Sequence, residues 1–106
     1  MRTLIEVAHD GEWIVVRLEG EIDVVSAPAA QERIAELQAM GYRNIRVDLE
    51  RVEFLDSQGV NLLVAARKGA LAEGGQVELH NPPDRVMELL KLMRLDDVFT
   101  IVRGQG

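Results

Sequence analysis

The sequence predicts an α/β fold: one domain with a mixed sheet of four to five strands and helices mainly on one face. Segments with the period of a strand alternate along the chain with segments that have the period of a helix. An Asp-Gly turn signal joins the first two strand-like segments, so at least one pair of strands should be antiparallel. The strand-like segments alternate apolar and polar residues, which indicates a sheet covered on one face.

The first third of the chain predicts a hairpin followed by a helix. Runs rich in β-branched residues at 4–8 and 13–20 flank a polar tip at 9–12, which contains the turn signal. Ser26 is placed to cap the next helix, whose first turn tolerates Pro28. Gly41 is expected to end this helix. The apolar stripe expected against the sheet is Ala30, Ile34, Leu37 and Met40.

The rest of the chain repeats strand and helix patterns. Residues 45–50 alternate apolar and charged side chains, as in a half-covered strand, and a second helix follows that ends at Gly74-Gly75. Its expected sheet-facing stripe is Val60, Leu63, Val64, Arg67 and Leu71. A strand at 76–79 precedes a third helix opened by residues 81–83, Asn-Pro-Pro, and a last apolar stretch at 98–102 is either a strand or a fragment of helix. The expected apolar residues of the third helix are Val86, Leu89, Leu90 and Met93.

The composition is typical of one globular domain spanning residues 1–106, with 47% hydrophobic and 28% charged residues and no linker or repeat. The formal net charge of −6 opposes binding to nucleic acid or to anionic membranes. Cysteine is absent and the two histidines are isolated, so no metal or other cofactor is expected. No apolar run is long enough to span a bilayer, and we expect a cytoplasmic protein without a membrane partner.

The candidate functional site is the strand-to-helix turn at residues 54–60, Phe-Leu-Asp-Ser-Gln-Gly-Val. Asp56 is placed to accept hydrogen bonds from the free amides of the first helical turn, and Ser57 stands where the helix dipole favours negative charge. A phosphate on Ser57 is therefore expected to enter an anion site. Gly59 would let another backbone or a nucleotide approach closely. By itself, an Asp-Ser pair at a helix start more often serves only as a cap.

Three separated segments resemble the successive signatures of bacterial anti-sigma factor antagonists, which are STAS domains. They are Leu-Glu-Gly-Glu-Ile-Asp at 18–23, Val-Asp-Leu at 47–49 and the turn at 54–60, and the similarity covers nearly the whole chain. The resemblance implies a regulator, not an enzyme, whose unphosphorylated form binds an anti-sigma factor serine kinase and so releases a sigma factor. It implies that the kinase phosphorylates Ser57, which ends binding, and that a PPM-type phosphatase resets the switch.

The resemblance also implies a partner-binding surface around the switch residue, with Asp23 lying near Ser57. The expected contact residues are Asp23, Asp56, Gln58, Gly59, Asn61 and Leu62. Gln58 stands where the family usually has serine or threonine, which leaves Ser57 as the only hydroxyl of the turn. Asn61 stands where glycine is often found and adds bulk where a partner docks. Leu62, with the small residues at 65–66, either extends a docking surface or widens the buried contact of the helix.

Two other interpretations remain open at this stage. The chain could be a structural STAS module that is not phosphorylated, in a signalling assembly or as an accessory subunit of a transporter. A hydrolase would combine Ser57 with His9 or His80 and an aspartate, but the Gly-x-Ser-x-Gly elbow is missing and His9 falls in the hairpin tip. The sequence therefore favours a binding module over an enzyme.

Overall fold

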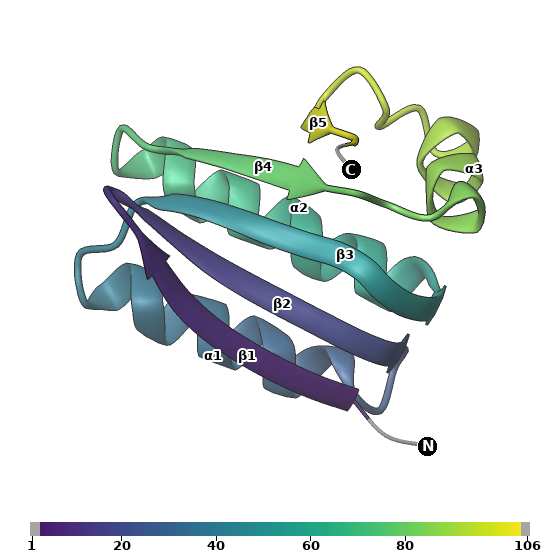
Figure 1. Ribbon diagram of the computed structural model, residues 1–106, viewed down its shortest axis with the longest axis horizontal. Coiled ribbons are helices and arrows are strands. Elements are labelled where there is room, and N and C mark those ends of the chain that lie inside the picture. Colours follow the sequence, from purple (N-terminus) through teal and green to yellow (C-terminus); the bar gives the residue numbers. More distant parts are fainter. Residues whose placement is uncertain (1–2, 105–106) are drawn as a thin grey trace.

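The computed structural model describes residues 3–104 as a five-stranded sheet with strand order β1-β2-β3-β4-β5 and three helices. Figure 1 shows α1 and α2 side by side against the same face of the sheet. In chain order the elements are β1 (Thr3–Asp10), β2 (Trp13–Ile22), α1 (Ala27–Ala39), β3 (Asn44–Leu55), α2 (Ser57–Ala72), β4 (Gln76–His80), α3 (Asp84–Leu92) and β5 (Thr100–Val102). The predicted mixed sheet with helices mainly on one face is confirmed. Within residues 3–104, no helix is long and apolar enough to cross a membrane.

One antiparallel hairpin and three parallel connections build the sheet. β1 and β2 pair antiparallel from Thr3 opposite Gly20 to Asp10 opposite Trp13, so the turn between them has two residues, fewer than the predicted tip. All the following neighbours, β2 with β3, β3 with β4 and β4 with β5, are parallel. Each parallel pair is joined by a crossover that contains one helix, which is the connection that parallel strands require.

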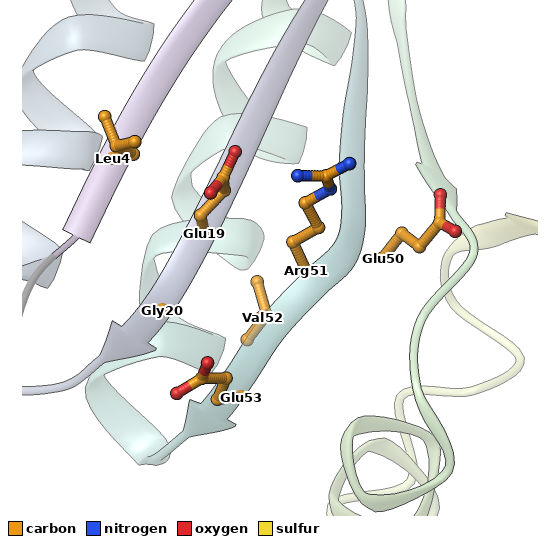
Figure 2. A pocket seen from close by; sticks show the side chains of 7 residues that line it. All are labelled: Leu4, Glu19, Gly20, Glu50, Arg51, Val52 and Glu53. Carbon is orange, nitrogen blue, oxygen red and sulfur yellow. The ribbon is translucent and has the colours of Figure 1, made fainter.

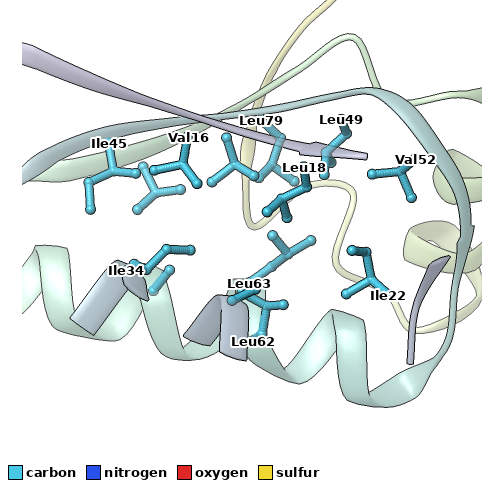
Figure 3. Close-up of a cluster of buried hydrophobic side chains, with 14 of the residues drawn as sticks. Val16, Leu18, Ile22, Ile34, Ile45, Leu49, Val52, Leu62, Leu63 and Leu79 are labelled. Carbon is cyan, nitrogen blue, oxygen red and sulfur yellow. The ribbon is translucent and has the colours of Figure 1, made fainter. Parts of the chain in front are cut away.

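The core lies between the sheet and the first two helices (Figure 3). Alternate residues of β2, β3 and β4 point to this side because successive side chains of a strand point to opposite faces. The fully buried members on the strands are Ile14, Val16, Leu18, Ile22, Ile45, Val47, Leu49 and Leu79, and those on α1 and α2 include Ala30, Val60, Leu62 and Leu63. The alternation predicted for residues 45–50 is therefore confirmed.

The other face of the sheet carries charged side chains in cross-strand pairs. Arg17 contacts Glu6 at 3.3 Å and Asp48 at 3.2 Å, which joins β1, β2 and β3. Arg46 contacts Asp10 at 2.6 Å and also lies over the ring of Trp13, 4.7 Å from its centroid. Trp13 thus packs beside the hairpin turn, and water reaches this face instead of a second layer of helices.

Both long helices differ in detail from the prediction. Ser26 occupies the position before α1, but its side chain makes no capping hydrogen bond, and Met40 is 68% exposed instead of packing on the sheet. In α2 the predicted stripe is correct at Val60 and Leu63, whereas Leu71 is 51% exposed. The buried face of α2 runs through Gly59, Val60, Leu62, Leu63, Ala66 and Ala70. The reason is that α2 packs against α1 as well as the sheet, so its contact stripe is rotated toward α1.

The third helix covers an edge that β4 leaves open. The pairing of β3 with β4 ends at Asp48 opposite His80, while β3 continues to Leu55. α3 lies beside this continuation, and the Arg85 guanidinium donates a hydrogen bond to the Glu53 carbonyl oxygen at 3.2 Å. A backbone group of the unpaired strand edge is thereby satisfied by a side chain. The last apolar stretch forms the short strand β5, which settles the ambiguity left by the sequence.

Candidate functional site

Two strand ends bring the candidate residues together. In the parallel register Ile22 is opposite Leu55, and the Asp56 amide donates a hydrogen bond to the Ile22 carbonyl oxygen at 3.2 Å. The loop that follows β2 therefore lies directly beside the turn that opens α2. Because the carboxyl ends of parallel strands meet at one edge of a sheet, Asp23 and Asp56 occupy neighbouring loops despite their separation in sequence.

Asp56 caps α2 as predicted. Its backbone is extended, with φ −104° and ψ −169°, and one carboxylate oxygen accepts hydrogen bonds from the amides of Gln58 at 2.8 Å and Gly59 at 3.1 Å. The Asp56 carbonyl oxygen accepts the bond from the Val60 amide at 3.0 Å, which starts the helical ladder. This arrangement satisfies amides that have no partner inside the helix.

Ser57 is the first residue of α2 and is exposed. Its hydroxyl makes no hydrogen bond to any residue in the described range 3–104. The two amides that should attract a phosphate already bind Asp56, so the predicted anion site is filled by a carboxylate. A phosphate on Ser57 would therefore face a second negative charge beside it, in addition to the favourable helix dipole.

Asp23 organises the neighbouring loop. One of its carboxylate oxygens accepts hydrogen bonds from the amides of Val25 at 3.0 Å and Ser26 at 3.1 Å. Hydrogen bonding from the Ser26 amide is the main reason that the pKa of Asp23 lies below its ordinary value, with the Val25 amide adding to the effect. The Ser26 hydroxyl donates to the Glu21 carbonyl oxygen at 2.7 Å and accepts from the Asp23 amide at 3.0 Å, so it holds this loop instead of capping α1.

The structure corrects two of the predicted contact residues. Gly59 is buried, and a Cβ there would lie 2.6 Å from Leu55 Cδ1 and 3.0 Å from the Ile22 carbonyl oxygen. Its missing side chain makes room for the chain's own packing, not for a partner or a nucleotide. Leu62 is fully buried and points into the core (Figure 3), so the expected partner contact is wrong for it, whereas Gln58 and Asn61 are exposed.

Apolar side chains that the sequence analysis did not select flank the turn. Val24 and Val25, next to Asp23, are 66% and 83% exposed. On the other side of the end of β3, Phe54 is 44% exposed and Leu92 of α3 is 81% exposed. Two consecutive valines in a loop directly after a strand were the available sequence signal. The exposure of Phe54 and Leu92 depends on how α3 packs and had no such signal.

A separate hollow opens on the charged face of the sheet, with a volume of about 560 Å³ (Figure 2). It forms where β2 and β3 shift register, between Arg17 and Glu19 and again between Gly20 and Glu21. Three glutamates and one arginine dominate its lining, which consists of Leu4, Glu19, Gly20, Glu50, Arg51, Val52 and Glu53. It contains no hydroxyl that a base could activate, and Ser57 is not part of it.

Neither histidine is placed to activate Ser57. The His9 ring meets the Tyr42 ring edge-on, with centroids 5.3 Å apart, near the hairpin turn. His80 Nε2 lies 2.8 Å from a carboxylate oxygen of Glu78 on the charged face of the sheet. In residues 3–104 these contacts give Ser57 no imidazole partner, so the arrangement is not that of a serine hydrolase.

Comparisons of sequence and of structure with known proteins lead to the same family. A family model described as the STAS domain matches residues 5–104. The anti-sigma-B factor antagonist of Bacillus subtilis (strain 168) is 32% identical over 101 residues, which cover 95% of this chain and 92% of that protein.

Solved structures with the same fold include several anti-sigma factor antagonists. The crystal structure of an anti-sigma factor antagonist from Mycobacterium paratuberculosis superimposes with a TM-score of 0.86 at 29% identity, covering 95% of this chain and 86% of that one. The unphosphorylated form of the anti-sigma factor antagonist SpoIIAA gives a TM-score of 0.84 at 24% identity, covering 97% and 90% of the two chains. Its phosphorylated form, from Bacillus, gives 0.79 at 23% identity, covering 97% and 93%. At these identities the SpoIIAA structures show the common fold.

Proposed function

Because this chain belongs to the STAS domain family, whose model spans residues 5–104, we propose that it is an anti-sigma factor antagonist controlled by phosphorylation of Ser57. In this proposal the unphosphorylated chain binds an anti-sigma factor that is also a serine kinase, and a sigma factor is released. Phosphorylation of Ser57 ends the complex, and a PPM-type phosphatase restores it. The chain acts in the cytoplasm as a binding module, not as an enzyme.

The observation that carries the proposal is the position of the Ser57 hydroxyl. Ser57 is an exposed residue at the start of a helix that Asp56 caps, and its hydroxyl has no hydrogen-bond partner in the described part of the chain. A kinase can therefore reach the hydroxyl without unfolding α2. The similarity to the Bacillus subtilis antagonist, which covers 95% of this chain, supports the same assignment.

Local electrostatics supply the physical reason for a switch. A phosphoserine carries about −1.5 to −2 charges at pH 7. Asp56 is the adjacent residue and Asp23 lies in the neighbouring loop, with a lowered pKa that keeps it ionised at neutral pH. A partner that packs on this surface would have to desolvate the added charge beside two carboxylates. A cost of about 1–3 kcal/mol would lower affinity by roughly one to two decades.

The test uses the anti-sigma factor kinase encoded in the same genome, purified and incubated with this chain and ATP. We expect one phosphate, mapped to Ser57 by peptide mass spectrometry, and none on Ser57→Ala. Calorimetry should show that wild type and Ser57→Ala bind the kinase with similar affinity, and that Ser57→Asp binds at least tenfold more weakly. A chain that stays unphosphorylated, or Ser57→Asp with wild-type affinity, would refute the switch and leave a structural STAS module.

A further inference from the structure

An apolar groove opens between the end of β3 and α3. Its volume is about 230 Å³, and its apolar lining is Phe54, Leu55, Val86, Leu89 and Leu92. Arg85 and Glu88, of opposite charge, also line it, and the Arg85 guanidinium is bound to the Glu53 carbonyl oxygen. We call this the α3 groove. It exists because β4 stops pairing at Asp48, so α3 covers the rest of β3 instead of another strand.

The α3 groove is continuous with the candidate switch. Leu55 lines the groove and is bonded to Asp56, the residue that caps α2 in front of Ser57. The loop with the exposed Val24 and Val25 adjoins the same turn from the β2 side, through the hydrogen bond between the Asp56 amide and Ile22. Ser57 therefore follows a strand end that has exposed apolar side chains on both sides.

We propose that the α3 groove receives an apolar side chain of the same anti-sigma factor that binds at Ser57. This inference rests on the proposed function and deepens it, because it assigns α3 to the partner-binding surface. The α3 groove, at about 230 Å³, is smaller than the roughly 300–1,000 Å³ of pockets that hold whole small molecules. The groove therefore matches a side chain better than a cofactor.

The apolar character of the α3 groove identifies the kind of contact. Removing an exposed leucine such as Leu92 from water lowers the free energy. The opposite charges of Arg85 and Glu88 leave the groove with no net charge to attract an ion. A partner surface seated here and on Val24-Val25 would cover Ser57 between them. A phosphate would then be desolvated under the contact, so the apolar surroundings help to explain why phosphorylation ends binding.

The experiment compares two equivalent leucine replacements. Leu92 is the last residue of α3, Leu71 is the last but one of α2, and both are exposed. Leu92→Gln and Leu71→Gln make the same substitution at leucines that are 81% and 51% exposed, with no change of charge and almost no change of helix propensity. We expect Leu92→Gln to bind the purified anti-sigma factor kinase at least tenfold more weakly, and Leu71→Gln to bind within twofold of wild type. When the rate of phosphorylation is measured against the concentration of the chain, Leu92→Gln should show a raised KM. Its kcat should be unchanged, since Ser57 is intact.

The possible outcomes separate this inference from the function it rests on. If Ser57→Asp loses affinity but Leu92→Gln binds like wild type, the α3 groove is not part of the interface, while the switch stands. Equal losses in both leucine variants would also overturn the inference. If wild type does not bind the kinase at all, the proposed function fails first. A concentration-dependent dimer that Leu92→Gln abolishes, seen by sedimentation, would assign the groove to a second copy of this chain and refute the proposal.

Discussion

Asp56 decides both where α2 begins and what charge Ser57 faces. Its carboxylate takes the amides of Gln58 and Gly59, which would otherwise be free to bind an anion at the helix N-terminus. The same residue that positions the serine therefore makes a phosphate there less favourable. Asp56 and Ser57 can therefore serve together as a helix cap and as a phosphorylation switch.

Removing the cap should weaken the fold. Asp56→Ala is expected to lower the free energy of unfolding by about 1 kcal/mol, because two amides at the start of α2 lose their acceptor. Asp56→Asn retains an oxygen acceptor of similar capping strength and should stay close to wild type. Urea denaturation followed by circular dichroism measures both variants. An unchanged midpoint in Asp56→Ala would show that the hydrogen bonds to Gln58 and Gly59 do not stabilise the fold.

The charge of Asp23 should make the stability of its loop depend on pH. Hydrogen bonds, chiefly from the Ser26 amide, lower the folded-state pKa of Asp23 below its ordinary value of 3.8. A lowered carboxyl pKa stabilises the folded state above the unfolded pKa, and this contribution is lost as pH falls through the folded pKa. Asp23→Asn should therefore be less stable than wild type at pH 7, and the difference should shrink below about pH 4. Denaturation at a series of pH values tests this, and a difference that is constant with pH would contradict it.

At the scale of elements, close packing at the start of α2 depends on a glycine. Gly59 faces Leu55 and the Ile22 carbonyl oxygen, which leaves no room for a methyl group. At a second glycine of the helix, Gly69, the atoms nearest to an added Cβ belong to the end of the Gln38 side chain. The two positions have the same backbone conformation class but different neighbours, so they respond differently to the same change.

Alanine at these two positions should have different effects. It gains about 1 kcal/mol of helix propensity in either place. At Gly59 we expect overpacking of about 1–3 kcal/mol to exceed that gain, for a net loss of roughly 1 kcal/mol. At Gly69 the Gln38 amide can move aside, at the expense of its 2.9 Å hydrogen bond to the Ala66 carbonyl oxygen, so the change should stay within about 0.5 kcal/mol. Thermal denaturation measures both, and a stabilised Gly59→Ala would show that β3 and α2 adjust easily.

The elements themselves were predictable where one local signal decided them. The Asp-Gly turn, the alternation at 45–50 and the glycines at 74–75 each specified an element through local geometry, and each appears in the structure. The buried faces of the helices were less predictable. Leu62 and Leu71 are both apolar, but one is fully buried and the other half exposed, because α2 is rotated toward α1. A period of 3.6 residues identifies a stripe without saying which neighbour it meets.

For the whole molecule, stability should be greatest at the centre of the sheet. β2 and β3 each have strands on both sides over much of their length and a buried apolar face, whereas β5 has three residues, only partly buried, at the edge. Regions with few buried contacts open locally at low free energy. We expect backbone amides of β2 and β3 to exchange slowest in native-state hydrogen exchange, and those of β5 fastest among the strands. Protection in β5 equal to that in β3 would show that the sheet opens only as one cooperative unit.

The same assembly of strands creates the site. Asp23 and Asp56 are 33 positions apart in sequence, and they come together because β2 and β3 are parallel neighbours that end at one edge. The α3 groove forms at that edge too, since α3 fills the space beyond the end of β4. The partner surface is therefore a property of the arrangement of the elements, not of one motif.

By itself, the sequence determined the order of strands and helices, the mixed sheet, the cap at Asp56 and the place of Ser57 at the start of a helix. These features follow from local backbone and hydrogen-bonding preferences, which neighbouring residues carry. Only the tertiary structure decided that Leu62 and Gly59 are buried, that Asp56 already fills the anion site, and that exposed valines and the α3 groove flank Ser57. These facts depend on which faces pack together, and packing couples residues that are distant in the chain.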